Sequence, residues 1–208
     1  MNEVQELLIA GVDEAGRGCL AGPVYSAAVI LPADHGIEGL NDSKKLSAAR
    51  RERLFVLIQA RALACAIARA EPREIDDINI LQASLLAMRR AVDALAIAPQ
   101  EAWVDGNQPP RLRCKVTTVI GGDALHPCIM AASILAKVAR DREMERLDTE
   151  YPGYGFARHK GYGTAVHMQA LRTLGVTPIH RMSFAPCSQL DLGFNASRPP
   201  PHASRQSA

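Results

Sequence analysis

The stretch AGVDEAGRGCLAGPV, residues 10–24, places two carboxylates, Asp13 and Glu14, directly after an apolar run at residues 7–10. The run predicts a β-strand at residues 7–13, and the following glycines predict that the strand ends or bulges there. Neighbouring side chains on a regular strand point to opposite faces, so both acids can serve one site only at such an interruption. The stretch therefore indicates a core strand with a functional site at its end.

Two further strand-like segments each lead to an acid beside glycine. Asp105 closes the segment 101–106, and Asp123 follows the segment 114–120 through two glycines. Because ligands of α/β sheets lie beyond strand ends, we expect the four carboxylates to converge. Four ionised carboxylates need a counter-charge, and Mg²⁺ or Mn²⁺ suits oxygen ligands; two such ions clamp a phosphodiester for displacement. The alternative is that each acid–glycine pair is a turn, which is favoured for a single pair but not for three together.

The remaining pattern predicts a mixed α/β sheet with helices on its faces. A second strand at 24–31 is close enough to the first to pair with it antiparallel, and a third is expected at 63–70. Apolar spacing and capping residues predict helices at 48–59, from Ile75 or Asn79 onward, at 127–147 and at 165–175. Residues 1–196 are expected to form the catalytic domain, and the Pro- and Ser-rich residues 197–208 a disordered tail.

Composition narrows the class of protein. The formal net charge is +2, so a nucleic-acid surface must be local. No apolar run approaches the roughly 18 residues that span a bilayer, and the acidic start of the chain does not resemble a signal peptide. The five cysteines form no Cys-x-x-Cys pair, so neither zinc nor a disulfide framework is expected. These features predict a cytoplasmic protein, and nothing in them requires more than a monomer.

Five segments in register resemble bacterial ribonuclease HII, from about Leu8 to Pro186. They are GVDEAGRG, LNDSKKLS, VDGN, AASILAKVARDREM and HKGYGT, at residues 11–18, 40–47, 104–107, 131–144 and 159–164. The resemblance implies a ribonuclease H-like fold, with a five-stranded mixed sheet flanked by α-helices and further helices at the C-terminal end. It also implies endonucleolytic hydrolysis of RNA in RNA–DNA hybrids and at single ribonucleotides in duplex DNA, with Mn²⁺ or Mg²⁺ as cofactor.

The resemblance also implies roles for individual residues. The metal-binding and catalytic acids would be Asp13, Glu14, Asp105 and Asp123. The backbone of Gly16, Arg17 and Gly18 would read the ribose 2′-hydroxyl, which distinguishes RNA from DNA. Further substrate contacts would come from Lys44, Ser133, Lys137 and Tyr162, the last by stacking on the sugar at the RNA-to-DNA step.

Other residues carry weaker expectations. His159 is expected to contact phosphate or product, and Asp141 and Glu143 to pair with Arg140 and Arg142 on the helix surface. A DNA nuclease of the same fold and a non-catalytic nucleic-acid-binding protein are rival functions. In a DNA nuclease the GRG segment and Tyr162 would have no 2′-hydroxyl to recognise. A non-catalytic nucleic-acid-binding protein usually has more aromatic residues than the 4% found here.

The segment QLDLGF, Gln189 to Phe194, resembles the short peptide with which bacterial replication and repair proteins bind the sliding clamp. Its leucines and phenylalanine could fill a pocket on such a partner. The alternative, that the segment ends a helix and packs on the core, is the more favoured of the two.

Overall fold

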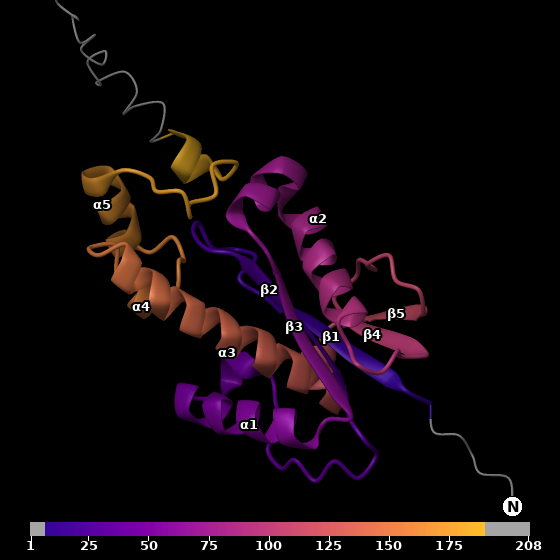
Figure 1. Ribbon diagram of the computed structural model, residues 1–208. Helices are drawn as coiled ribbons and strands as arrows, with labels where there is room; N and C mark the ends of the chain where they lie inside the picture. The colour runs from indigo at the N-terminus through magenta and orange to yellow at the C-terminus, as the bar shows by residue number, and fades with distance from the viewer. Residues whose placement is uncertain (1–6, 190–208) are drawn as a thin grey trace, which may run out of the picture.

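β1 (Ile9–Ala15) is the central strand of the computed structural model, which describes residues 7–189. It pairs antiparallel with β2 (Val24–Ile30) and parallel with β4 (Glu101–Asp105). β3 (Ala64–Ala70) extends the sheet beside β2, and β5 (Lys115–Val119) extends it beside β4. The order β3-β2-β1-β4-β5 gives the predicted five-stranded mixed sheet (Figure 1).

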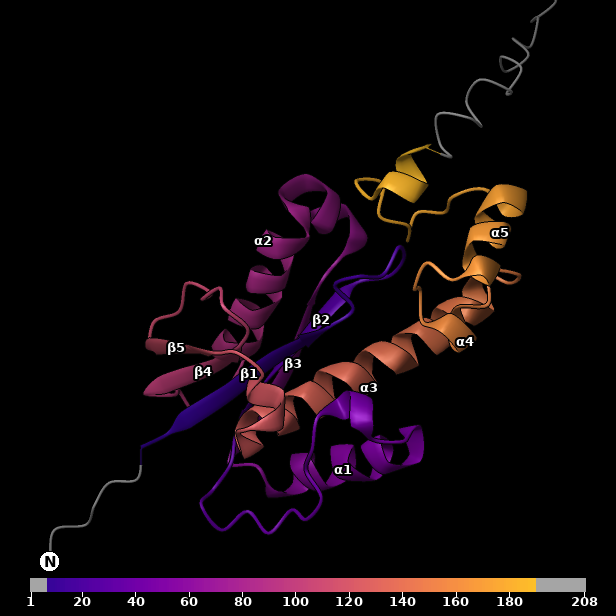
Figure 2. The same ribbon diagram turned by 180° about the vertical axis from the view of Figure 1, so that it is seen from behind.

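Helices cover both faces of this sheet, as Figures 1 and 2 show. α1 (Ala48–Arg61) and α3 (Pro127–Glu150) lie on one face, and α2 (Pro72–Asp93) lies on the other. Every residue of β2 is buried, with Ala27 and Val29 packed toward α1 and α3, and Ala28 toward α2. This is why β2 is a continuous apolar run rather than an alternating one.

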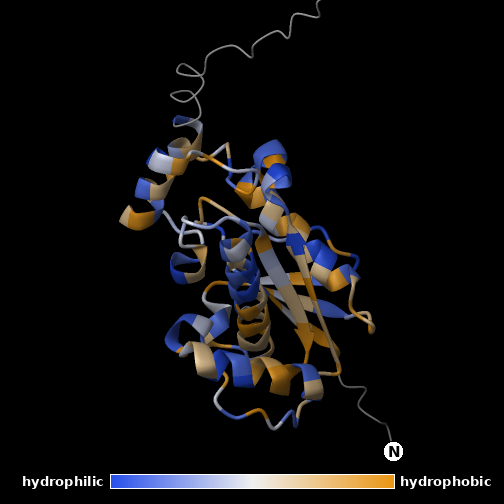
Figure 3. Cartoon of the chain, turned by 60° about the vertical axis from the view of Figure 1, so that its left-hand side comes forward, coloured by the Kyte–Doolittle hydropathy of each residue, from blue (hydrophilic) through white to orange (hydrophobic). Residues whose placement is uncertain are grey.

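The C-terminal elements pack around the far end of α3. They are α4 (Phe156–His159) and α5 (Ala165–Leu174), followed by a helical turn at residues 185–189. The N-terminal half of α3 is mostly hydrophobic and its C-terminal half mostly hydrophilic (Figure 3). The first half therefore packs against the sheet, while Met144 and Leu147 in the second half contact Phe156 and Leu171 in a separate apolar cluster.

Several element boundaries differ from the sequence prediction, two of them near residues of interest. β1 extends to Ala15, two residues beyond the predicted end at residue 13, so both Asp13 and Glu14 lie inside the strand. α2 begins at Pro72, earlier than expected, because Glu71 and Glu74 form a capping box. The second expected start, Asn79, is a kink with φ 66°, where its side chain accepts a hydrogen bond from the Gln82 N–H. Two short 3₁₀ helices, η1 (Ser43–Lys45) and η2 (Gly122–Ala124), were not predicted.

All five cysteines carry free thiols. Within residues 7–189, no helix is long and apolar enough to cross a membrane. The predicted domain boundary at residues 196–197, and all of the QLDLGF segment except the exposed Gln189, lie outside the described residues. The boundary therefore stays a prediction.

Candidate active site

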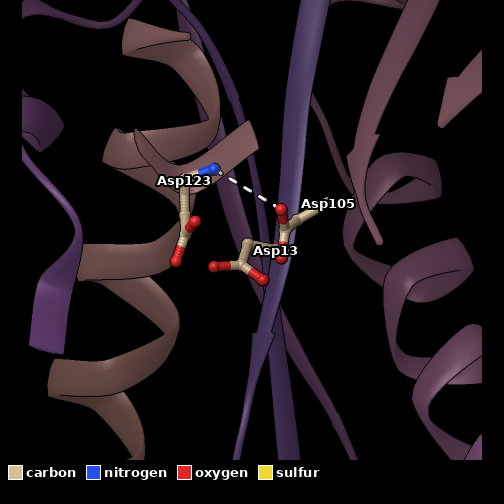
Figure 4. Close-up of side chains that lie close together, drawn as sticks. All are labelled: Asp13, Asp105 and Asp123. Carbon is tan, nitrogen blue, oxygen red and sulfur yellow. Dashed lines mark hydrogen bonds between the residues drawn. The ribbon is translucent and has the colours of Figure 1, made fainter. Parts of the chain in front are cut away.

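Three aspartates from separate segments meet at one edge of the sheet. Asp13 comes from β1, Asp105 from the last position of β4, and Asp123 from η2, which follows β5. One carboxylate oxygen from each residue lies within 4.8 Å of the others, and the side chains point toward one another (Figure 4). The backbone N–H of Asp123 donates to Asp105 Oδ1 at 3.4 Å. Parallel pairing of β1 with β4 and of β4 with β5 produces this convergence.

The electrostatics of this cluster favour a cation. Burial, followed by the nearby charge of Glu14, raises the pKa of Asp13 well above its ordinary value, while a hydrogen bond from Ser133 opposes the rise. Burial and the charge of Asp123 likewise raise the pKa of Asp105. Each ionised carboxylate therefore costs free energy that a bound cation would offset. The donor set of the cluster consists of oxygen atoms alone, which fits a hard divalent ion such as Mg²⁺ or Mn²⁺.

Glu14 lies beside the cluster rather than within it. Its Oε1 is 3.4 Å from Nη1 of Arg17, and it does not belong to the group of mutually close ligand atoms. Burial raises the pKa of Glu14, Arg17 counteracts this, and Asp105 adds to it, so Glu14 lies within electrostatic range of the cluster. Its predicted role as a metal ligand stays a prediction.

Lys44 lies next to another member of the cluster, Asp123. Its Nζ lies 3.5 Å from Asp123 Oδ2. Partial burial alone would lower the pKa of Lys44, but Asp123, Asp42 and Asp13 outweigh burial and raise it. Beneath the lysine, the hydroxyls of Ser43 and Ser133 are 2.9 Å apart, which links η1 to α3. Lys44 and Ser133 therefore both lie beside the aspartates.

Lys137 lies one helical turn further along α3 than Ser133. Its Nζ is 2.7 Å from Asp141 Oδ1, and Arg51 of α1 contacts the other oxygen of Asp141 at 3.5 Å. The expected pairing of Asp141 with Arg140 is therefore wrong, because adjacent helix residues do not face each other. Glu143 pairs with Arg69 and Arg146, and Arg142 with Glu52.

Tyr162 is half-exposed, and buried histidines hold its backbone. His167 Nδ1 lies 3.0 Å from the Tyr162 carbonyl, and His167 Nε2 lies 3.1 Å from His180 Nε2. The Thr177 N–H donates to His180 Nδ1, so His180 donates through Nε2 and His167 donates to Tyr162. Burial lowers the pKa of His167, and lowers that of His180 to about 4, which keeps this relay neutral. The histidines are structural, as expected for His167 and His180.

The expectation for His159 is wrong. This side chain is buried, its Nε2 lies 2.8 Å from the Tyr154 carbonyl, and its Nδ1 accepts a hydrogen bond from the Gly161 N–H. Both ring nitrogens are therefore occupied within the protein. His159 supports the turn that carries Tyr162 instead of facing a ligand.

Comparison with known proteins agrees with this fold. The family model for ribonuclease HII matches residues 10–187. Ribonuclease HII of Bordetella pertussis is 62% identical over 179 residues, which cover 86% of this chain and 89% of that protein. The crystal structure of ribonuclease H2 from Pyrococcus horikoshii superposes with a TM-score of 0.77 at 28% identity, covering 91% of this chain and 99% of that one.

A third relative was solved in a complex. The ribonuclease HII in the PCNA:RNase HII complex from Archaeoglobus fulgidus matches with a TM-score of 0.68 and 28% identity, covering 86% of this chain and 95% of that one.

The fold and the oxygen-only carboxylate cluster define a metal-dependent nuclease. Within that class, the chain belongs to the ribonuclease HII family. The resemblance found in the sequence is therefore confirmed.

The raised pKa of Asp13 leads to a test by protein stability. In the folded protein Asp13 keeps its proton to higher pH than in the unfolded chain, so the folded state binds more protons above about pH 4. Stability of the metal-free protein should therefore fall as pH rises through this window. We expect Asp13→Asn to raise the melting temperature in EDTA at pH 7, by about 2–4 °C for each kcal/mol of relief.

The matched control is Asp34→Asn, an exposed loop aspartate, which should leave the melting temperature unchanged. Adding Mn²⁺ should raise the melting temperature of the wild type and of the control more than that of Asp13→Asn. A lower melting temperature of Asp13→Asn in EDTA, or an equal response to Mn²⁺, would count against the account.

Proposed function

We propose that this protein hydrolyses the RNA strand of RNA–DNA hybrids and nicks duplex DNA at single embedded ribonucleotides, leaving 5′-phosphate and 3′-hydroxyl ends. The observation that carries the proposal is the position of the aspartate cluster. It lies directly beside the glycine loop, residues 16–22, which continues β1. One side of the site therefore suits metal ions, and the other presents backbone to a substrate.

In this proposal Asp13, Glu14, Asp105 and Asp123 hold Mg²⁺ or Mn²⁺. Two such ions, when bound, would supply a nucleophilic water and neutralise charge on the phosphate. Lys44 remains exposed beside Asp123, so its ammonium group can also meet the phosphate backbone. Ser133 holds η1 in place through Ser43, and Lys137 on the same helix supplies a further positive charge close to the duplex.

The backbone of Gly16, Arg17 and Gly18 would donate to the 2′-hydroxyl, and Tyr162 would stack on the sugar at the RNA-to-DNA step. Gly16 has φ +97°, which favours glycine, and a Cβ at Gly18 would meet no atom within 4 Å. The outer side of the loop is therefore open to a ligand. These features favour a ribonucleotide substrate over the rival DNA nuclease, in which they would have no task.

The direct test is cleavage of duplex DNA that carries one ribonucleotide. We expect nicking beside the ribonucleotide in Mn²⁺ or Mg²⁺, no nicking in EDTA, and none of an all-DNA duplex. Asp105→Asn should lose at least about 100-fold in rate while keeping its fold. Binding without cleavage would favour the non-catalytic alternative, and equal cleavage of the all-DNA duplex would favour the DNA nuclease.

The role of Tyr162 can be tested separately. Because a stacked ring positions the reacting sugar, Tyr162→Ala should lower the nicking rate by about 10–100-fold with little change in duplex affinity. Tyr162→Phe keeps the ring and should retain most of the rate, which makes it the matched control. A Tyr162→Ala variant with wild-type kinetics would exclude the stacking role.

The Gln189–Phe194 segment provides a second proposal, that it binds a sliding clamp. Gln189 is exposed at the end of the described residues, and the Archaeoglobus fulgidus relative was solved in a complex with PCNA. We expect purified clamp to retain the full chain but not Leu192→Ala/Phe194→Ala, while the nicking activity of both stays equal. Equal retention of the two proteins, or retention of neither, would leave packing on the core as the better interpretation.

A further inference from the structure

Two buried arginines lie beneath the glycine loop, and the reaction does not use either side chain. Arg140 of α3 is 1% exposed and Arg181 is 0% exposed. Within residues 7–189, neither forms an ion pair with a carboxylate; both donate to backbone carbonyls instead. Burying a guanidinium costs free energy unless its donors are satisfied, and here backbone carbonyls satisfy them in place of a carboxylate. Burial also lowers the pKa of Arg181 to about 10.

Arg181 holds both ends of the loop. Its Nη2 donates to the Gly16 carbonyl at 2.7 Å, and its Nη1 donates to the Arg17 carbonyl at 2.8 Å. Its Nε and Nη2 both donate to the Gly22 carbonyl, at 3.0 and 2.9 Å. Its backbone N–H donates to the carbonyl of Leu20 at 2.9 Å. One side chain thus fixes carbonyls at three positions, which the planar fork of arginine can do and a lysine cannot.

Arg140 ties the same loop to the segment that carries Tyr162. Its Nε donates to the Pro23 carbonyl and its Nη2 to the Ala21 carbonyl, each at 3.2 Å. Its Nη1 donates to the Lys160 carbonyl at 2.9 Å. The guanidinium also lies directly under Gly16, where a Cβ would come within 1.9 Å of Nε. The two elements proposed to contact the sugar therefore share one support.

The backbone N–H groups of the loop differ from its carbonyls, which the two arginines bind. The backbone N–H groups of Gly16, Arg17 and Gly18 have no acceptor among the described residues. The carbonyls of Gly16 and Arg17 are turned inward onto Arg181, and the outer side of Gly18 is open. A row of unpaired N–H groups needs an acceptor oxygen from outside the protein, as a sugar hydroxyl can provide.

We infer that Arg181 and Arg140 are positioning residues for sugar recognition: by binding the carbonyls of the loop from inside, they fix its N–H groups outward, toward the 2′-hydroxyl of a ribonucleotide. The inference rests on the proposed function. Neither arginine touches substrate, and their effect passes through the Gly16–Gly22 backbone and, for Arg140, also through Lys160. The competing interpretation is that they only fasten the C-terminal segment to the core.

Arg181→Lys and Arg140→Lys test the inference, because lysine keeps the charge but lacks the fork. Affinity is measured by fluorescence anisotropy in EDTA, for a duplex with one ribonucleotide and for the same sequence in DNA. The ratio of the two dissociation constants does not depend on the fraction of folded protein. The matched control is Arg172→Lys, at an exposed arginine of α5 whose side chain donates to Gln169.

We expect the wild type and Arg172→Lys to prefer the ribonucleotide duplex. In both test variants the ratio of the all-DNA dissociation constant to the ribonucleotide-duplex dissociation constant should fall toward 1. The all-DNA affinity should stay unchanged, and kcat/KM for nicking should fall by about 100-fold. A preserved preference together with weaker affinity for both duplexes would show a purely structural role and overturn the inference. Loss of the folded circular-dichroism spectrum in both variants would do the same.

A failure of the proposed function can be distinguished from a failure of this inference. A wild-type protein that nicks no ribonucleotide-containing duplex would refute the function itself. A wild type that nicks but binds both duplexes equally would instead overturn the inference about the loop, because outward N–H groups would then not read the sugar.

Discussion

The contact between β1 and α3 at Gly11 is the constraint on which the rest of the structure depends. A Cβ at Gly11 would lie 2.1 Å from the backbone carbon of Cys128, so no other residue fits there without displacing the helix. This close approach places the start of α3 directly against the central strand. It thereby sets Ser133 of α3 beside Asp13, only two residues beyond Gly11, and lets α3 carry Arg140 beneath the glycine loop.

The site built on this contact concentrates negative charge where the sheet excludes water. The carboxylates of Asp13 and Asp105 are partly desolvated and repel their acidic neighbours, which is unfavourable for the protein without a cation. Lys44, whose Nζ lies 3.5 Å from Asp123 Oδ2, offsets part of this charge. Such a cluster lowers stability, and its natural use is to bind divalent ions. The adjacent loop has the opposite character, since its N–H groups, which have no acceptor within residues 7–189, attract an acceptor oxygen.

The sequence predicts the strands and the acids well because both depend on local pattern. Apolar runs that end in Asp and Gly mark β1, β4 and β5, although the shared edge of the three strands follows from their parallel pairing, which is a tertiary feature. Glu14 shows what the sequence pattern does not predict. It lies within β1 next to Asp13, so alternation along the strand separates the two side chains, and the folded structure places Glu14 beside Arg17.

The sequence does not predict that either arginine is buried. For Arg140, the adjacent Asp141 suggests a surface pair instead. The helical spacing contained a signal for Arg140, which continues a buried stripe on α3 formed by Ala132, Ala136, Arg140, Met144 and Leu147. Arg181 offered no such pattern, since its partners Gly16, Arg17 and Gly22 lie about 160 residues away in the chain.

The function depends on whether the cluster of Asp13, Asp105 and Asp123 binds divalent metal. Anomalous diffraction from crystals grown with Mn²⁺ tests this most directly, because it locates the ion without reference to activity. The account predicts manganese peaks within bonding distance of the Asp13, Asp105 and Asp123 oxygens, about 2.0–2.3 Å away. Well-ordered aspartates with no manganese peak between them, at a concentration that supports catalysis, would contradict it.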